Sequence, residues 1–85
     1  MSWTAIYSDL AETDLDNMPK EIAREIVLKV KEIEKDPFTH LQKMRKFPLY
    51  KFRVRNYRGI VSMSNRKLFI NIVKIKHRNI AYKYL

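Results

Sequence analysis

The spacing of apolar residues changes once along this chain, and that change restricts the fold more than any other feature of the sequence. In the first half, branched apolar residues recur every three or four positions: Ile22, Ile26, Val30 and Ile33. In the second half, apolar and basic residues alternate one by one: Tyr50, Lys51, Phe52, Arg53, Val54 and Arg55. The first spacing is that of a helix face and the second is that of a strand. The sequence therefore predicts helices followed by strands.

Local signals set the limits of the first elements. The β-branched and aromatic segment Trp3–Tyr7 fits a short strand. Ser8 is a suitable N-cap for a helix that reaches about Asp16, and Pro19 fits the first position of a second helix. That helix is expected to end near Asp36, because the proline that follows disfavours helix in the residue before it. The short connection predicts an antiparallel helical hairpin.

Three strands are expected after Pro48. A turn at Asn56–Tyr57 separates the first from the second, Arg58–Met63, and a turn at Asn65 leads to the third, Leu68–Lys76. The nearly continuous apolar character of the third predicts a central position. The order β-α-α-β-β-β predicts one α+β domain over residues 1–85, in which an N-terminal strand and the helical hairpin pack on a mainly antiparallel sheet.

Composition excludes several classes of protein. The 85 residues include no cysteine, so disulfides and thiolate metal sites are ruled out. The first residues lack the basic start and apolar core of a secretory signal, and no apolar run approaches the ~20 residues that cross a bilayer. We therefore expect a soluble, cytoplasmic protein without a membrane partner.

Charge is divided unevenly between the two halves. All nine acidic residues lie in the first 36 positions, together with five Lys or Arg, for a net charge of −4. Residues 37–85 contain thirteen Lys or Arg and no Asp or Glu, for a net charge of +13. Unbroken positive charge lowers stability because like charges repel. The second half therefore indicates a surface that binds a polyanion, in preference to one kept basic for solubility alone.

Alternation places basic side chains on one face of the predicted sheet. Lys51, Arg53 and Arg55 are two residues apart, so they are expected to point away from the apolar face that the helices cover. Strand pairing is expected to bring further basic residues to the same face: Arg58, Lys74, Lys76 and Arg78. Clustered guanidinium and ammonium groups bind phosphates, so the sequence predicts a phosphodiester-binding surface.

Cleavage of RNA by its own 2′-hydroxyl requires a base, a group that neutralises the phosphorane and an acid for the leaving oxygen. Arginine suits the second task, and Lys51 among neighbouring cations suits the first. Tyr82 is a candidate for stacking on a base or donating a proton. His40 is interpreted as incidental, and for His77 a structural role is favoured over one in orienting phosphate.

No metal or other cofactor is expected. Two isolated histidines without cysteine do not indicate a zinc site. A magnesium site requires carboxylates, and none follows Asp36. The sequence therefore predicts a metal-independent reaction.

Three motifs occur in a characteristic order: Leu49-Tyr50-Lys51, Tyr57-Arg58, and His77-Arg78 followed by Tyr82. With the aspartate–proline–phenylalanine segment at residues 36–38, they resemble the RelE/ParE superfamily of toxins from toxin–antitoxin systems, and archaeal RelE in particular. The resemblance covers essentially the whole chain. It implies the RelE fold, cleavage of messenger RNA in the ribosomal A site, and a RelB-like antitoxin as partner.

The resemblance also implies roles for individual residues. Lys51 and Arg53 match the family's basic strand residues for proton abstraction and phosphate binding, and Arg58 matches the arginine that stabilises the transition state. Arg78 matches the arginine that activates the leaving group or holds phosphate, and Tyr82 matches the tyrosine that stacks on the message. The predicted catalytic residues are Lys51, Arg53, Arg58, Arg78 and Tyr82, and the predicted RNA-binding residues are Arg55, Lys74, Lys76 and His77.

The sequence departs from the family pattern at two places. Arg55-Asn56 replace a frequent glycine–aspartate, and Gly59 replaces a bulky apolar residue and is expected to weaken or bulge its strand. Two other functions stay open, a gyrase inhibitor of the ParE type and a non-catalytic RNA-binding module. The joint presence of Arg58, Arg78 and Tyr82 favours RelE over ParE.

Overall fold

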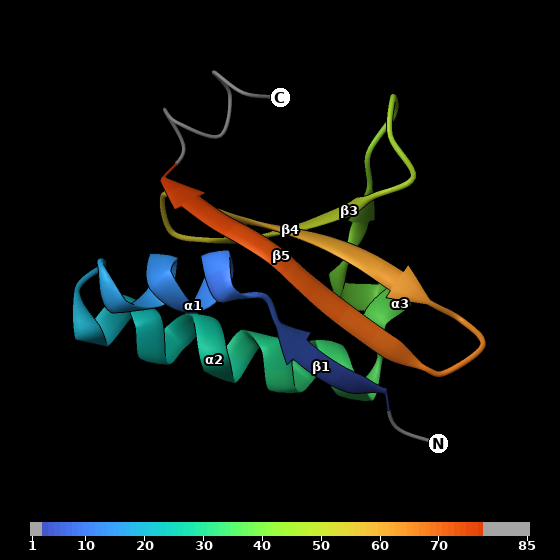
Figure 1. The fold of residues 1–85 in the computed structure, drawn as a ribbon, viewed down its shortest axis with the longest axis horizontal. Helices are drawn as coiled ribbons and strands as arrows, with labels where there is room; N and C mark the ends of the chain where they lie inside the picture. The colour runs from blue at the N-terminus through green and yellow to red at the C-terminus, as the bar shows by residue number, and fades with distance from the viewer. Residues whose placement is uncertain (1–2, 78–85) are drawn as a thin grey trace.

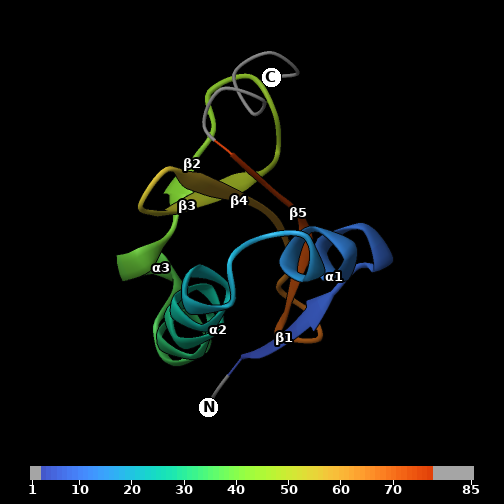
Figure 2. The ribbon, with the colours of Figure 1, turned by 90° about the vertical axis from the view of Figure 1, so that its left-hand side faces the viewer.

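A computed structural model describes residues 3–77, in which a curved sheet lies over two helices (Figure 1). The elements in chain order are β1 (Thr4–Tyr7), α1 (Asp9–Asp16), α2 (Lys20–Lys35), α3 (Pro37–His40), β2 (Gln42–Lys43), β3 (Tyr50–Val54), β4 (Tyr57–Ser64) and β5 (Phe69–His77). Figure 2 shows α1 and α2 on the same side of the sheet, with α3 beside β2 and β3. The predicted α+β class, N-terminal strand and helical hairpin are confirmed.

The helices begin and end where local chemistry directs them. Ser8 caps α1, because its Oγ accepts a hydrogen bond from the backbone N–H of Ala11 at 3.0 Å. Pro19 is the N-cap of α2, so the helix begins one residue later than predicted, at Lys20. The helix ends at Lys35, and Pro37 then starts α3, a four-residue helix that the sequence did not predict. No helix within residues 3–77 combines the length and the apolar character that a membrane span requires.

The sheet has the strand order β1-β5-β4-β3-β2. Only the pairing of β1 with β5 is parallel, and the other three pairings are antiparallel, as predicted for a mainly antiparallel sheet. The strand predicted to be central is β5. It is an inner strand with a neighbour on each side, whereas the middle of the five strands is β4. The two-residue strand β2 at the other edge was not predicted.

The core lies between the sheet and the two long helices. It is built from Ala11, Met18, Ile26, Val30, Ile33, Phe52, Val61, Ile70, Ile72 and Ile75. Gly59 lies directly beneath the ring of Phe52, and a Cβ atom at this position would stand only 2.1 Å from Phe52 Cε2. The irregular pairing with β5 occurs between Ile60 and Val61, so the expected bulge lies beside Gly59 and not at it. Gly59 therefore gives the Phe52 ring its space.

The outer edge of β1 is closed by the end of α2. The backbone N–H of Trp3 donates to the carbonyl of Glu34 at 3.0 Å, and the N–H of Ala5 donates to the Glu34 carboxylate at 2.8 Å. A single helical residue thus satisfies one donor of this edge strand and one of the residue before it, on a side where β1 has no strand partner.

Candidate functional site

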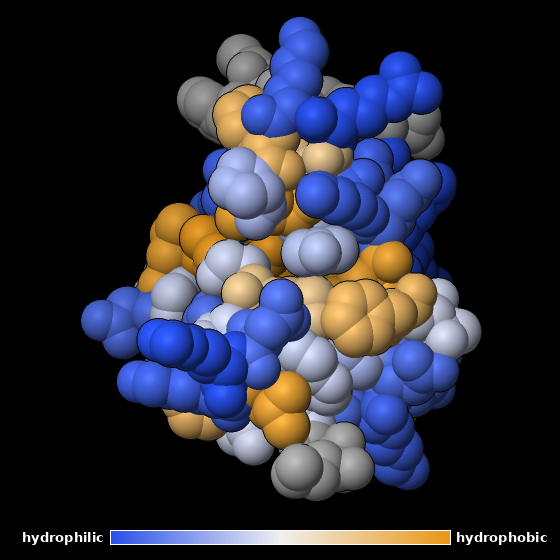
Figure 3. Space-filling model, turned by 90° about the vertical axis from the view of Figure 1, so that its right-hand side faces the viewer, coloured by the Kyte–Doolittle hydropathy of each residue, from blue (hydrophilic) through white to orange (hydrophobic). Residues whose placement is uncertain are grey.

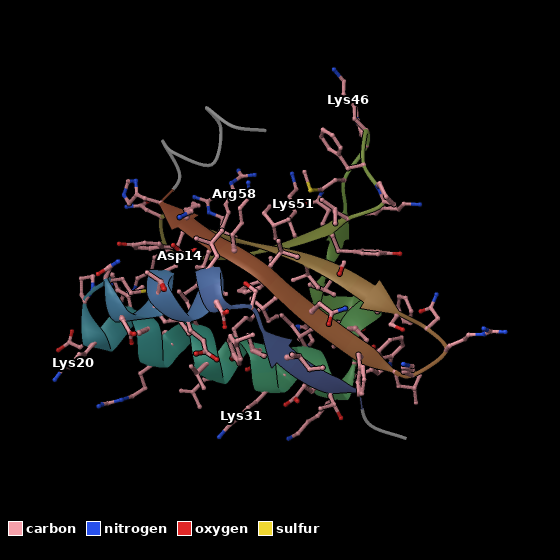
Figure 4. All side chains as sticks on the ribbon, in the orientation of Figure 1. Asp14, Lys20, Lys31, Lys46, Lys51 and Arg58 are labelled. Atoms are coloured by element: carbon pink, nitrogen blue, oxygen red, sulfur yellow. The ribbon has the colours of Figure 1, made fainter. Side chains whose placement is uncertain are left out.

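Basic side chains cross the uncovered face of the sheet in two rows. Because the Cβ direction of Gly59 meets Phe52 in the core, its neighbours Arg58 and Ile60 point to the opposite face. One row is Lys51–Ile60–Lys74 and the next is Arg53–Arg58–Lys76. We call the five basic members, Lys51, Arg53, Arg58, Lys74 and Lys76, the cationic face. Figure 4 shows Lys51 and Arg58 on the side of the strands away from the helices.

Like charges stand directly opposite each other in this arrangement. Arg53 pairs with Arg58 across β3 and β4, and Arg58 pairs with Lys76 across β4 and β5. Side chains at such positions have Cβ atoms about 5 Å apart, and like charges there are destabilising. Asp14 of α1 neutralises Lys76, but neither β3 nor β4 contains an Asp or Glu beside Arg53 and Arg58. The arrangement is therefore suited to an anionic ligand, which removes the repulsion when it binds.

An apolar side chain forms the floor of the cationic face. Ile60 points to the uncovered face, yet it is only 1% exposed. It lies between Lys51 and Lys74 in its row. An apolar floor lowers the local dielectric, and electrostatic attraction to a bound phosphate is stronger there than on a fully hydrated surface.

Two hydrogen-bonded contacts fix members of the cationic face. Arg53 Nε donates to the carbonyl of Arg55 at 3.0 Å. Lys76 Nζ lies 2.7 Å from a carboxylate oxygen of Asp14, whose other oxygen accepts from the N–H of Ile75 at 2.9 Å. The Asp14 side chain is only 9% exposed. Asp14 therefore ties α1 to the end of β5 and holds Lys76 in place.

The structure places Arg55 outside the cationic face, so the prediction that it continues the row of Lys51 and Arg53 is wrong. Arg55 lies in the turn after β3 with a φ of 54°, a conformation that favours glycine. Its Nε and Nη2 donate to the carboxylate of Glu25 in α2 at 2.5 and 2.9 Å. These hydrogen bonds lower the pKa of Glu25 from its usual value. Arg55 thus joins the turn to a helix.

His77 lies on the helix side of the sheet and not on the cationic face. It follows Lys76 in β5, and its ring meets that of Tyr57 edge to face with centroids 5.3 Å apart. The predicted structural role fits this position better than phosphate binding does. The remaining two predicted catalytic residues, Arg78 and Tyr82, lie outside the described residues.

The cationic face opens into two hollows that share Gln42 and Lys51. The first, of about 210 Å³, is lined by His40, Gln42, Lys51, Phe52, Arg53 and Arg58. The second, of about 350 Å³, follows the loop between β2 and β3 and is lined by Gln42, Lys43, Met44, Arg45, Lys46, Phe47 and Lys51. In Figure 3, hydrophilic side chains (blue) lie beside hydrophobic ones (orange) at the top of the molecule, where this loop lies.

Sequence reasoning missed both His40 and the loop. His40 was interpreted as incidental, although it lines the first hollow. The loop cations Lys43, Arg45 and Lys46 were counted in the net charge without being assigned a place. Their density within four residues was the available signal. Within residues 3–77, no three His, Asp or Glu side chains gather in a way that suits a metal ion.

Comparison with known proteins identifies the family. A family model described as the ParE toxin of the type II toxin–antitoxin system parDE matches residues 5–82. The chain belongs to the RelE/ParE superfamily of toxins. The resemblance inferred from the motifs is confirmed. No match was found among curated protein sequences.

Solved structures of the superfamily share the fold. The toxin of the RelBE2 toxin–antitoxin complex from Mycobacterium tuberculosis superposes with a TM-score of 0.85 at 18% identity, over 92% of this chain and 100% of the other. The archaeal RelE–RelB complex from Pyrococcus horikoshii gives a TM-score of 0.79 at 24% identity, over 92% and 97% of the two chains. A free RelE mutant from E. coli gives 0.84 at 17% identity, over 99% and 92%. At identities below 25%, these superpositions show a shared RelE fold.

Proposed function

We propose that this toxin is a metal-independent endoribonuclease of the RelE type, which cuts messenger RNA in the ribosomal A site and so inhibits translation in the cytoplasm. The observation that carries the proposal is the cross-strand pair Arg53–Arg58, which lines one hollow together with Lys51 beside buried Ile60. This arrangement fits one phosphodiester and the extra negative charge that develops on it during cleavage.

The proposed reaction uses the RNA's own 2′-hydroxyl. Its oxygen attacks the adjacent phosphorus, the bond to the 5′ oxygen breaks, and a 2′,3′-cyclic phosphate forms. Lys51 in its amine form accepts the 2′ proton, and Arg53 and Arg58 hold the non-bridging oxygens of the phosphorane. The roles of Arg78 in supporting the leaving 5′ oxygen and of Tyr82 in stacking on the message remain predictions.

A RelB-like antitoxin is the proposed protein partner. The solved relatives from Mycobacterium tuberculosis and Pyrococcus horikoshii are toxins in complex with their antitoxins. An acidic segment of such a partner complements the cationic face, and its binding there would block access of RNA.

The decisive test is cleavage in a translating extract, mapped by primer extension on a defined message. Wild-type toxin is expected to give discrete cuts within codons, and Arg58→Ala is expected to lower their rate about 10²–10³-fold, the effect of removing one donor to the transition state. Arg66→Ala is the matched control, because Arg66 lies in the exposed turn between β4 and β5 and is expected to leave the rate unchanged. Equal cutting by Arg58→Ala would remove the site assignment.

Gyrase inhibition is the second candidate, because the matching family model is that of ParE toxins. It predicts an intact message in the same extract and loss of supercoiling, or DNA breaks, when purified gyrase is incubated with the toxin. RNA that is bound with a steep salt dependence but never cut would indicate the non-catalytic binding module.

A further inference from the structure

The first hollow contains one side chain with no assigned role. His40, at the end of α3, lines it together with Lys51, Arg53 and Arg58. The three basic residues reach the hollow from β3 and β4, whereas His40 reaches it from the short helix next to the sheet edge. A phosphate in this hollow would therefore meet protein groups from two directions.

A contact with α2 determines which ring nitrogen of His40 carries the hydrogen. Lys29 Nζ lies 3.4 Å from His40 Nδ1. An ammonium group has only hydrogens to donate, so Nδ1 accepts and the ring hydrogen is assigned to Nε2. Glu32, 3.9 Å from Lys29 Nζ, balances the charge of that lysine. The contact with Lys29 thus leaves the Nε2–H of His40 as the donor that can face a ligand.

We propose that His40 donates a hydrogen bond from Nε2 to a non-bridging oxygen of the scissile phosphate, as a binding group in addition to the cationic face. The inference rests on the proposed ribonuclease function and extends it. The Nε2–H of His40 reaches the hollow from α3, so it adds a hydrogen bond to a phosphate that Lys51, Arg53 and Arg58 contact from the strands. Lys29 is the positioning residue, because it fixes the orientation of the ring.

Three variants test the proposal in the translating extract. His40→Ala removes the donor and is expected to lower the cleavage rate about 100-fold. His40→Gln keeps an amide N–H near the position of Nε2 and is expected to stay within about threefold of wild type, whereas a purely packing role would not distinguish the two variants in this way. Arg66→Ala is again the control, since Arg66 lies in the exposed turn between β4 and β5 and does not line the hollow, and it is expected to cut like wild type.

A second measurement does not depend on the ribosome. Uridine 2′,3′-cyclic monophosphate, which carries the product end of the proposed reaction, is titrated into the full chain while the ring signals of both histidines are followed by NMR. The signals of His40 are expected to shift and those of His77 to stay in place. In Lys29→Met, the nitrogen shifts of His40 are expected to change before any ligand is added, because Nδ1 loses its donor.

The outcomes separate the two proposals. If His40→Ala cuts the message as fast as wild type, the role of His40 is overturned and the ribonuclease function stays in place. The same conclusion follows if His40→Ala and His40→Gln lose activity equally. An intact message with wild-type toxin overturns the ribonuclease function. In that case the titration still decides whether His40 binds phosphate, and an unshifted His40 signal overturns the inference.

Discussion

The single glycine of the chain offers the sharpest test of how the cationic face is supported. A Cβ at position 59 would stand 2.1 Å from Phe52 Cε2 and 2.2 Å from Cζ, whereas carbon atoms in contact are about 3.5–4.0 Å apart. In Gly59→Ala, the ring must therefore move by about 1.5 Å. Phe52 is only 4% exposed and is packed in the core, so the ring has little room to move.

The magnitude follows from two opposing effects. Overpacking of a core costs about 1–3 kcal/mol. Replacement of glycine in a strand returns about 0.5–1 kcal/mol, because the unfolded chain loses freedom. We expect Gly59→Ala to lower the free energy of unfolding by about 1–2 kcal/mol, and each kcal/mol lowers the Tm of a domain of this size by about 4–8 °C. Thermal and urea unfolding followed by circular dichroism measure both quantities.

A double-mutant cycle isolates the contact. Phe52→Leu removes the Cε2 and Cζ atoms that the new methyl group would meet, so in that background Gly59→Ala is expected to cost less by about 1 kcal/mol. A Tm that is unchanged or raised in Gly59→Ala would refute the reasoning, as would an equal cost in both backgrounds. Because Lys51 and Arg53 flank Phe52, the single variant is also expected to cut RNA more slowly.

Three further predictions concern the contacts around the site. Asp14→Asn is expected to lower the free energy of unfolding by about 1–3 kcal/mol in urea titrations, since Lys76 loses its buried counter-ion, and the exposed neighbour Asp16→Asn is expected to change little. Burial, and then the charge of Glu34, raise the pKa of Tyr7 to about 12. The unfolded phenol ionises near pH 10 and the folded one later, so stability is expected to fall as the pH rises from about 10 to 12, and a fall equally steep in Tyr7→Phe would contradict this. Arg45→Gln and Lys46→Gln in the loop are each expected to reduce the salt dependence of RNA binding, by about 0.7 in the slope of log K against log salt, as measured by fluorescence anisotropy. Arg66→Gln, with an unchanged slope, is the control.

The sequence predicted the elements that local chemistry determines. The helix of Ile26, Val30 and Ile33 has both a strong period and a proline after it, so its identity and its end could be deduced without tertiary information. The two-residue strand β2 and the four-residue α3 have no period of their own. They form because the chain must return from α2 to the edge of β3, which is a tertiary constraint.

The prediction that the basic residues lie together is correct within the regular strands. It is wrong for Arg55, where the strand gives way to a turn. Lys51, Arg53 and Arg58 lie on one face because β3 and β4 pair regularly through them. The pattern was extended one residue too far at Arg55, which is in the turn. His77 is two residues after buried Ile75, so its place on the helix side could have been inferred from the same alternation. The place of His40 in the first hollow could not have been inferred from alternation, because it depends on how α3 packs against the sheet.

The hydrogen bonds from Trp3 and Ala5 to Glu34 have a consequence for the behaviour of the protein at high concentration. A strand of sequence Thr-Ala-Ile-Tyr at the rim of a sheet is a template on which another copy can polymerise if its amide groups are exposed. Here Glu34 of α2 occupies the amide of Ala5 and that of Trp3 just before the strand, so this rim is less able to recruit a neighbouring molecule in register. Loss of the carboxylate at position 34 would free the Ala5 amide for a strand of another copy, while the bond from Trp3 to the Glu34 backbone carbonyl would remain.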